Sequence, residues 1–304
     1  MNITPSTYKD VPALACEANG LRARFLPEHG GKCASLVDLA TGRELLEQAP
    51  GEQYLPLTYG GDYVAAECSA FDDMFPTIDA CHYPDFPWQG ALMPDHGEVC
   101  GLPWQHERTG AGLHLWVYSL RFGYRLDKWV EPGEGGLVIR YEARNLTPYP
   151  LDCLYAAHLM LAAERGAEIE LPYAEGAACT VVFTDDPLMG GYGDKLPWRE
   201  ALAPTPGRDA RLAYKLFFDA PPPAGWCRYR YADGTAFELT FDRQQLPYLA
   251  LWANYGSFKG LYNVAFEPMT AAFDRPDIAR LHRKNCVLPG NGVLRWQLGL
   301  RMVR

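Results

Sequence analysis

The sequence predicts an all-β fold, a large antiparallel β-sandwich with few short helices. Apolar and polar residues alternate with a period of two in three long runs, at 120–126, 137–144 and 294–302. Such alternation places apolar side chains on one face of a strand and polar side chains on the other, as a half-buried strand requires. Helical periodicity is sparse, and no regular succession of strands and helices points to a parallel sheet.

Further strands are expected where aromatic and aliphatic residues dominate, at 151–161, 236–242, 247–253 and 262–267. Residues typical of turns separate these runs, at 131–133, 232–234 and 289–292. One short helix is expected over 276–284, with Asp274 as its candidate N-cap.

Three long irregular segments interrupt the predicted strands, at 60–110, 183–215 and 254–260. The first is crowded with His, Asp, Trp and Pro. Long ordered loops on a β scaffold are where binding and catalytic sites tend to be built. We therefore expect site residues in these segments.

The composition is that of a globular protein, since 48% of the 304 residues are hydrophobic and 21% are charged. All-β sandwiches often form one long domain, so a single domain over 1–304 is expected. The net charge of −9 argues against nucleic acid as a partner and, more weakly, against an anionic membrane. Nine scattered cysteines without a secretion signal predict reduced thiols and a cytoplasmic location. The sequence gives no indication of oligomeric state.

Three residues stand out as candidates for acid–base chemistry. His96 lies in the long first loop, where a plain surface histidine is an equally good interpretation. His158 lies in an otherwise apolar strand, which by itself favours a satisfied core histidine. Glu267 ends an apolar strand and precedes Pro268; a carboxylate there costs desolvation unless it is paired, used or turned to water.

Weaker candidates could bind a substrate. Asp72 and Asp73 could bind hydroxyl groups or cap a turn. Trp104 and Trp252 could stack on a sugar ring, although a core role is the default for any single tryptophan, and Asn254 adjoins the second of them. No second pair of ligands has the spacing of a metal site, and no glycine-rich loop opens a helix to bind phosphate. Neither a metal nor a nucleotide is expected.

Taken together, several segments resemble the aldose 1-epimerase (galactose mutarotase-like) superfamily, and the resemblance runs nearly from end to end. His158 lies where the second site histidine of that family is expected, in a strand near the middle of the chain. The other matching segments, in chain order, are LPEHGG (26–31), SLVD (35–38), TGREL (41–45), DMFPTI (73–78), DHG (95–97), LPW (102–104), FEPMT (266–270), and LPG (288–290) followed by Trp296.

The resemblance implies a β-supersandwich that binds a small sugar and interconverts its anomers without a metal or an organic cofactor. In mutarotation, a base removes the anomeric proton while an acid protonates the ring oxygen. The resemblance implies that Glu267 is the base, His158 the acid and His96 a polarising donor, and the last two roles could be exchanged. No Arg or Lys occurs at 60–95, where the family carries a site arginine, and this points to a divergent branch.

Two other classes of function fit the same sequence. The first is a non-catalytic sugar-binding or sensory protein on this fold, since a fold does not fix a function. The second is a glycoside-active hydrolase or lyase. Hydrolases usually need two carboxylates across the scissile bond, so Glu267 would have to face Asp72 or Asp73 across the cleft.

Overall fold

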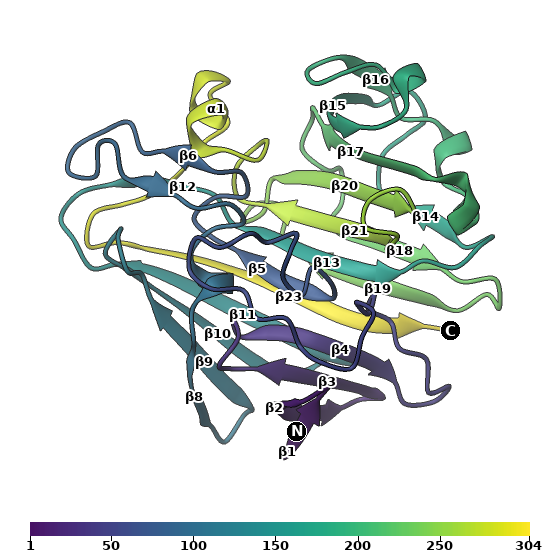
Figure 1. Ribbon diagram of the computed structural model, residues 1–304, viewed down its shortest axis with the longest axis horizontal. Coiled ribbons are helices and arrows are strands. Elements are labelled where there is room, and N and C mark those ends of the chain that lie inside the picture. Colours follow the sequence, from purple (N-terminus) through teal and green to yellow (C-terminus); the bar gives the residue numbers. More distant parts are fainter.

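The computed structural model describes all residues from Met1 to Arg304, and two large antiparallel sheets dominate it (Figure 1). The larger sheet has eleven strands in the order β1-β2-β3-β4-β5-β13-β21-β20-β17-β15-β16. In chain order these are β1 (Asn2–Tyr8), β2 (Val11–Ala18), β3 (Leu21–Leu26), β4 (Lys32–Asp38), β5 (Phe71–Met74), β13 (Ala156–Ala162), β15 (Ala178–Thr184), β16 (Lys195–Pro197), β17 (Leu212–Phe218), β20 (Tyr248–Tyr255) and β21 (Tyr262–Met269).

The smaller sheet has eight strands in the order β14-β18-β19-β23-β11-β10-β9-β8. They are β8 (Gln105–Arg108), β9 (Leu113–Tyr118), β10 (Tyr124–Gly133), β11 (Gly136–Asn145), β14 (Glu168–Glu170), β18 (Trp226–Arg230), β19 (Ala236–Phe241) and β23 (Val293–Val303). Two further pairs stand apart: β6 (Cys81–His82) with β7 (Leu92–Met93), and β12 (Leu151–Cys153) with β22 (Cys286–Leu288). The all-β prediction is confirmed.

Helices are few and short. They are α1 (Pro276–Leu281) and the 3₁₀ turns η1 (Val99–Gly101), η2 (Pro187–Met189), η3 (Glu200–Leu202) and η4 (Arg208–Ala210). None of them is long and apolar enough to cross a membrane. The N-cap position of α1 is Arg275, which makes no capping side-chain hydrogen bond. The prediction that Asp274 caps this helix is therefore wrong.

Most of the long alternating runs are strands, with local differences. The runs at 137–144 and 294–302 lie in β11 and β23, which pair with each other. The run at 120–126 is a strand only from Tyr124 onward, because residues 119–123 form the turn that leads into β10. The turn expected at 131–133 is displaced to 134–135, since β10 continues to Gly133 with Pro132 opposite Leu137.

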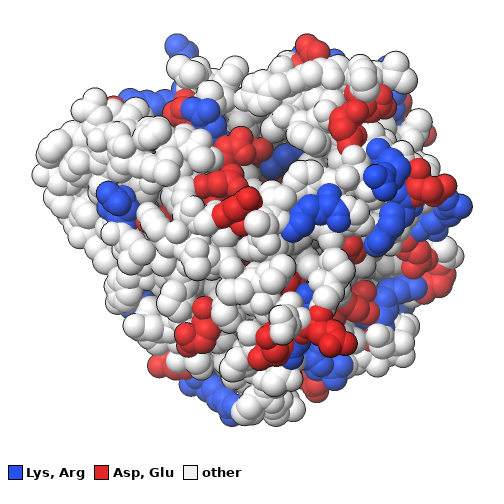
Figure 2. Space-filling model, in the orientation of Figure 1, with Lys and Arg blue, Asp and Glu red and all other residues white.

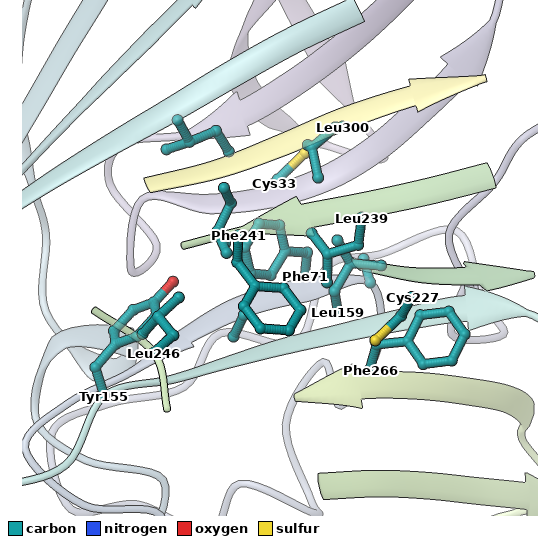
Figure 3. Close-up of a cluster of buried hydrophobic side chains, with 14 of the residues drawn as sticks. Cys33, Phe71, Tyr155, Leu159, Cys227, Leu239, Phe241, Leu246, Phe266 and Leu300 are labelled. Atoms are coloured by element: carbon teal, nitrogen blue, oxygen red, sulfur yellow. The ribbon is translucent and has the colours of Figure 1, made fainter. Parts of the chain in front are cut away.

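The main core lies between the two sheets and contains 60 buried residues. Figure 3 shows its character: Phe71, Leu159 and Phe266 of the larger sheet pack in one cluster with side chains of the smaller sheet, such as Leu239 and Leu300. At about 1.5–3 kcal/mol for each large apolar side chain fully removed from water, such a core supplies most of the driving force for folding. Hydrophobic burial therefore fixes which face of each strand points inward.

The period-two alternation of the central strands then decides what the outer face of the larger sheet carries. In β21, Val264 and Phe266 point into the core between the sheets, so Glu267 points to the opposite side. In β17, Leu216 faces the core and Lys215 the outer side. The same rule applies to β13 and β20. Neighbouring strands thus bring polar side chains together on one outer surface.

Candidate active site

A cavity of about 280 Å³ lies over the outer face of the larger sheet, where β13, β21, β20 and β17 are neighbours. Figure 2 shows a hollow in this face of the molecule, with acidic side chains at its rim and a basic group within it. The residues that line the cavity are Tyr63, Val64, Cys68, Ile78, Asp79, His96, His158, Met160, Val182, Phe183, Lys215, Trp252, Asn254, Phe258, Leu261, Asn263, Glu267 and Asp274.

The structure brings His96, His158 and Glu267 together in this cavity, although they are far apart in sequence. The imidazole Nε2 of His158 lies 3.8 Å from Oε1 of Glu267. The ring centres of His96 and His158 are 5.9 Å apart, with their planes at 79°. One carboxylate and two imidazoles therefore face a common space.

Glu267 lies at the floor of the cavity and has no exposed surface. Lys215 holds one side of its carboxylate, with Nζ 2.8 Å from Oε2. Neither carboxylate oxygen has a hydrogen bond, and Oε1 also lacks a close ion-pair partner, since its nearest one, Nε2 of His158, is 3.8 Å away. Burial raises the pKa of Glu267, and Lys215 opposes that rise. The strand does not end at this residue, because β21 continues through Pro268 to Met269.

His158 is buried on the outer face of β13, with an exposed fraction of 8%. Burial lowers the pKa of His158 well below its ordinary value, and the neighbouring His96, Lys215 and Lys32 lower it further. The ring is therefore uncharged at neutral pH. Nε2 faces the carboxylate of Glu267, so an N–H at this nitrogen is attracted by the negative charge without forming a hydrogen bond at 3.8 Å.

His96 is held in a constrained loop. Its backbone has a φ of +59°, and Gly97 follows with a φ of +79°. A Cβ at Gly97 would lie 2.4 Å from the carbonyl oxygen of Phe75, so only glycine fits there. Nδ1 of His96 lies 2.7 Å from the carboxylate of Asp95, and its ring stacks on Tyr63 with ring centres 3.7 Å apart. The orientation of the imidazole is thus fixed from two sides.

Two further predicted residues, Trp252 and Asn254, line the cavity from β20. Nε1 of Trp252 donates to Oδ1 of Asn263 at 3.0 Å. The amide of Asn254 donates to the carbonyl of Phe258 and accepts from its N–H, which closes the loop after β20. With Phe183 at 5.6 Å between ring centres, Trp252 forms an aromatic wall.

Asp72 and Asp73 lie in β5 but do not line the cavity. Asp72 pairs with Lys32 and accepts from the hydroxyl of Tyr63 at 2.9 Å. Asp73 pairs with Lys128 at 2.8 Å, and both side chains are 2% exposed. These carboxylates are occupied in buried ion pairs, so we leave them out of the site.

Trp104 is also buried away from the cavity, with an exposed fraction of 2%. Its Nε1 donates to the carbonyl of Val99 at 2.9 Å, and its ring lies 4.8 Å from Nζ of Lys128. Trp104 therefore supports the buried charge of Lys128 by a cation–π contact, and we leave it out of the site as well.

Six polar or titratable residues that line the cavity are not among the predicted site residues: Tyr63, Cys68, Asp79, Lys215, Asn263 and Asp274. Lys215 was assigned to an irregular loop, and Asp274 to a helix cap, while Tyr63 and Asp79 were not singled out. A signal for Lys215 was present, since it is the one charged residue in the apolar run 212–218. A lysine in such a run costs desolvation unless it has a partner, which is the same argument that singled out Glu267.

The comparisons with known proteins support the fold. No protein-family model matches the sequence, and no curated protein matches it. Among solved structures, a protein from Synechocystis sp. PCC 6803 is similar, with a TM-score of 0.73 and 15% identity over 99% of this chain and 98% of that one. A galactose mutarotase-like protein from Clostridium acetobutylicum has a TM-score of 0.68 and 12% identity over 99% and 98% of the two chains.

A third similar structure is a galactose mutarotase related enzyme from Lactobacillus acidophilus, with a TM-score of 0.68 and 11% identity. The similarity covers 96% of this chain and 97% of that one. Identities of 11–15% over nearly whole chains show a shared architecture with a divergent sequence. The chain therefore has the galactose mutarotase-like β-sandwich fold.

Proposed function

We propose that the chain is an aldose 1-epimerase-like mutarotase, which interconverts the α and β anomers of an aldose by general acid–base catalysis. One observation carries the proposal: the buried carboxylate of Glu267 keeps Oε1 free of hydrogen bonds, inside a cavity that two imidazoles also face. The cavity, at about 280 Å³, is close to the lower end of the size range of small-molecule sites.

In a cyclic sugar, the anomeric hydroxyl oxygen and the ring oxygen are bonded to the same carbon, C1. Groups that act on both oxygens must therefore lie close together, as the Glu267 carboxylate and the two imidazoles do. Glu267 takes the proton of the anomeric hydroxyl through Oε1. The bond between C1 and the ring oxygen then breaks, its electron pair goes to the ring oxygen, and an imidazolium delivers a proton there. Rotation about the C1–C2 bond of the open-chain aldehyde and the reverse proton transfers give the other anomer.

The structure favours exchanging the roles that the resemblance gives to the histidines. His158 is uncharged, so it suits the role of a donor that polarises the anomeric oxygen through Nε2–H. The imidazole of His96 is more open to the cavity and the solvent, with 17% of its side chain exposed, and its Nδ1 lies 2.7 Å from the carboxylate of Asp95. We therefore assign proton delivery to the ring oxygen to His96.

The charge of the cavity predicts which sugars are accepted. Three carboxylates (Asp79, Glu267 and Asp274) line it against one ammonium, Lys215, which already pairs with two of them. Because like charges repel strongly in a partly desolvated site, glucose 6-phosphate and glucuronate should have a kcat/KM at least about tenfold below that of glucose, a penalty of about 1.4 kcal/mol or more. Equal kcat/KM values for neutral and anionic sugars would contradict the predicted preference for neutral sugars.

The proposal is tested by NMR measurement of anomer exchange across a panel of neutral aldoses, with purified protein against a buffer blank. Acceleration of exchange supports it. Sugar binding without any acceleration would instead favour a non-catalytic sugar-binding protein. The hydrolase alternative requires Asp72 or Asp73 to face Glu267 across the cleft. Neither carboxylate reaches the cavity, so this pairing does not support a hydrolase.

A further inference from the structure

The ammonium group of Lys215 is shared between two buried carboxylates. Its Nζ lies 2.8 Å from Oε2 of Glu267 and 2.8 Å from Oδ1 of Asp274. The three side chains are 8%, 0% and 7% exposed, in the order lysine, glutamate, aspartate. One cation thus serves two anions, and the trio is negative as a whole.

The backbone at each member of this trio is held in place by the fold. Lys215 is fixed by the alternation of β17, whose neighbouring residues Tyr214 and Leu216 are buried in the main core. Asp274 follows β21 and is held by its backbone carbonyl, which accepts from the N–H groups of Ile78 and Asp79 at 3.0 and 2.9 Å. The distances within the trio are therefore set by the fold and not by free side chains.

We propose that Lys215 is a positioning residue which keeps Glu267 ionised inside the cavity, and that Asp274 limits this effect by competing for the same cation. The inference rests on the proposed function only in taking the ionised carboxylate of Glu267 as the catalytic base. The charge state of Glu267 can be measured whether or not the protein is a catalyst.

The physical argument is a balance of opposed effects on one group. Burial favours the neutral form of Glu267 and raises its pKa; Lys215 lowers that pKa, and the negative charge of Asp274 raises it. Burial also disfavours the charged form of Lys215, but Asp274 and Glu267 together raise the lysine's pKa above its ordinary value, so it stays protonated. The other titratable groups that line the same cavity are His158, His96, Asp79, Tyr63 and Cys68.

Because the two neighbours act with opposite sign, their removal should move Glu267 in opposite directions. We expect the titration midpoint of the Glu267 carboxyl carbon, followed by ¹³C NMR and assigned by its absence in Glu267→Gln, to rise by at least about one pH unit in Lys215→Met. In Asp274→Asn it should fall, since the lysine then serves Glu267 alone. Lys215→Arg keeps the positive charge, so the midpoint of Glu267 should stay close to the wild-type value.

The same opposition should appear in catalysis. Activity needs the ionised base and is lost as the pH falls through the midpoint of Glu267. The acidic limb of the anomer-exchange profile should therefore move to higher pH in Lys215→Met and to lower pH in Asp274→Asn. A lysine with a merely structural role would lower the amount of folded protein without moving the limb.

The chain offers a matched control in Lys195 and Asp219, a lysine–aspartate pair at 2.7 Å that does not line the cavity. Lys195→Met and Asp219→Asn should leave the midpoint of Glu267 unchanged. If Lys215→Met does not fold, Asp274→Asn decides alone: a lower midpoint supports the proposal, and an unchanged or higher one overturns it. Wild-type protein that exchanges no anomers would refute the mutarotase assignment, while the carboxyl titration would still decide the role of Lys215.

Discussion

Replacing Glu267 by Gln should reduce catalysed anomer exchange by at least about 10²-fold, the usual range for loss of a general base being about 10²–10⁴. Glutamine keeps the shape of the side chain but cannot take the anomeric proton. The protein should still fold, because Lys215 retains Asp274 as a partner at 2.8 Å and is not left as an unpaired buried charge. NMR should show that anomer exchange is lost, circular dichroism that the variant is folded, and sugar titration that it still binds.

A matched control is Glu164→Gln, since the side chain of Glu164 is 38% exposed and does not line the cavity. This control should exchange anomers at the wild-type rate. If Glu267→Gln did so as well, Glu267 would not be the base, and the mutarotase assignment would lose its main support.

Replacing Asp73 by Asn should destabilise the fold by about 3–5 kcal/mol, the usual cost of leaving one partner of a buried ion pair alone. Asp73 lies in the larger sheet and Lys128 in the smaller one, so their contact at 2.8 Å joins the two sheets across the sandwich. The hydroxyl of Tyr155 also donates to Asp73, at 2.8 Å. Urea unfolding followed by fluorescence would measure the change.

Two further variants separate this effect from a general sensitivity to substitution. Asp209→Asn removes one partner of the exposed pair with Arg165 and should leave the urea midpoint unchanged. Lys128→Met combined with Asp73→Asn should cost less than the sum of the single changes, because no lone charge remains buried. Full additivity of the two changes would contradict the coupling of the pair.

The architecture could be predicted from the sequence because alternation reports directly on burial. The runs that became β11 and β23 have one face in the core, and their apolar residues mark it. Turn positions were less accurate, since Pro132 is tolerated inside β10. Local turn propensity did not override the pairing of a long hairpin.

The site was harder to predict, because the local sequence around a charged residue is similar whether that residue lines a cavity or belongs to a buried ion pair. Asp73 and Glu267 each lie in a strand next to apolar residues. Asp73 pairs with Lys128 of the other sheet, whereas Glu267 faces the cavity. Such partners come from distant parts of the chain, and one sequence without relatives does not reveal them. The same holds for Asp274, whose partner Lys215 lies 59 positions earlier.

The division of each central strand between two faces constrains how this protein can diverge. Inserting or deleting one residue inside β21 would exchange the faces, sending the carboxylate of Glu267 into the apolar core and the ring of Phe266 into the cavity. Changes of length are therefore excluded from the strands that carry Lys215 and Glu267, and are left to the loops that supply Tyr63, His96 and Phe258. Exchange of these loops can then reshape the rim of the cavity while Lys215 and Glu267 keep their places on the sheet.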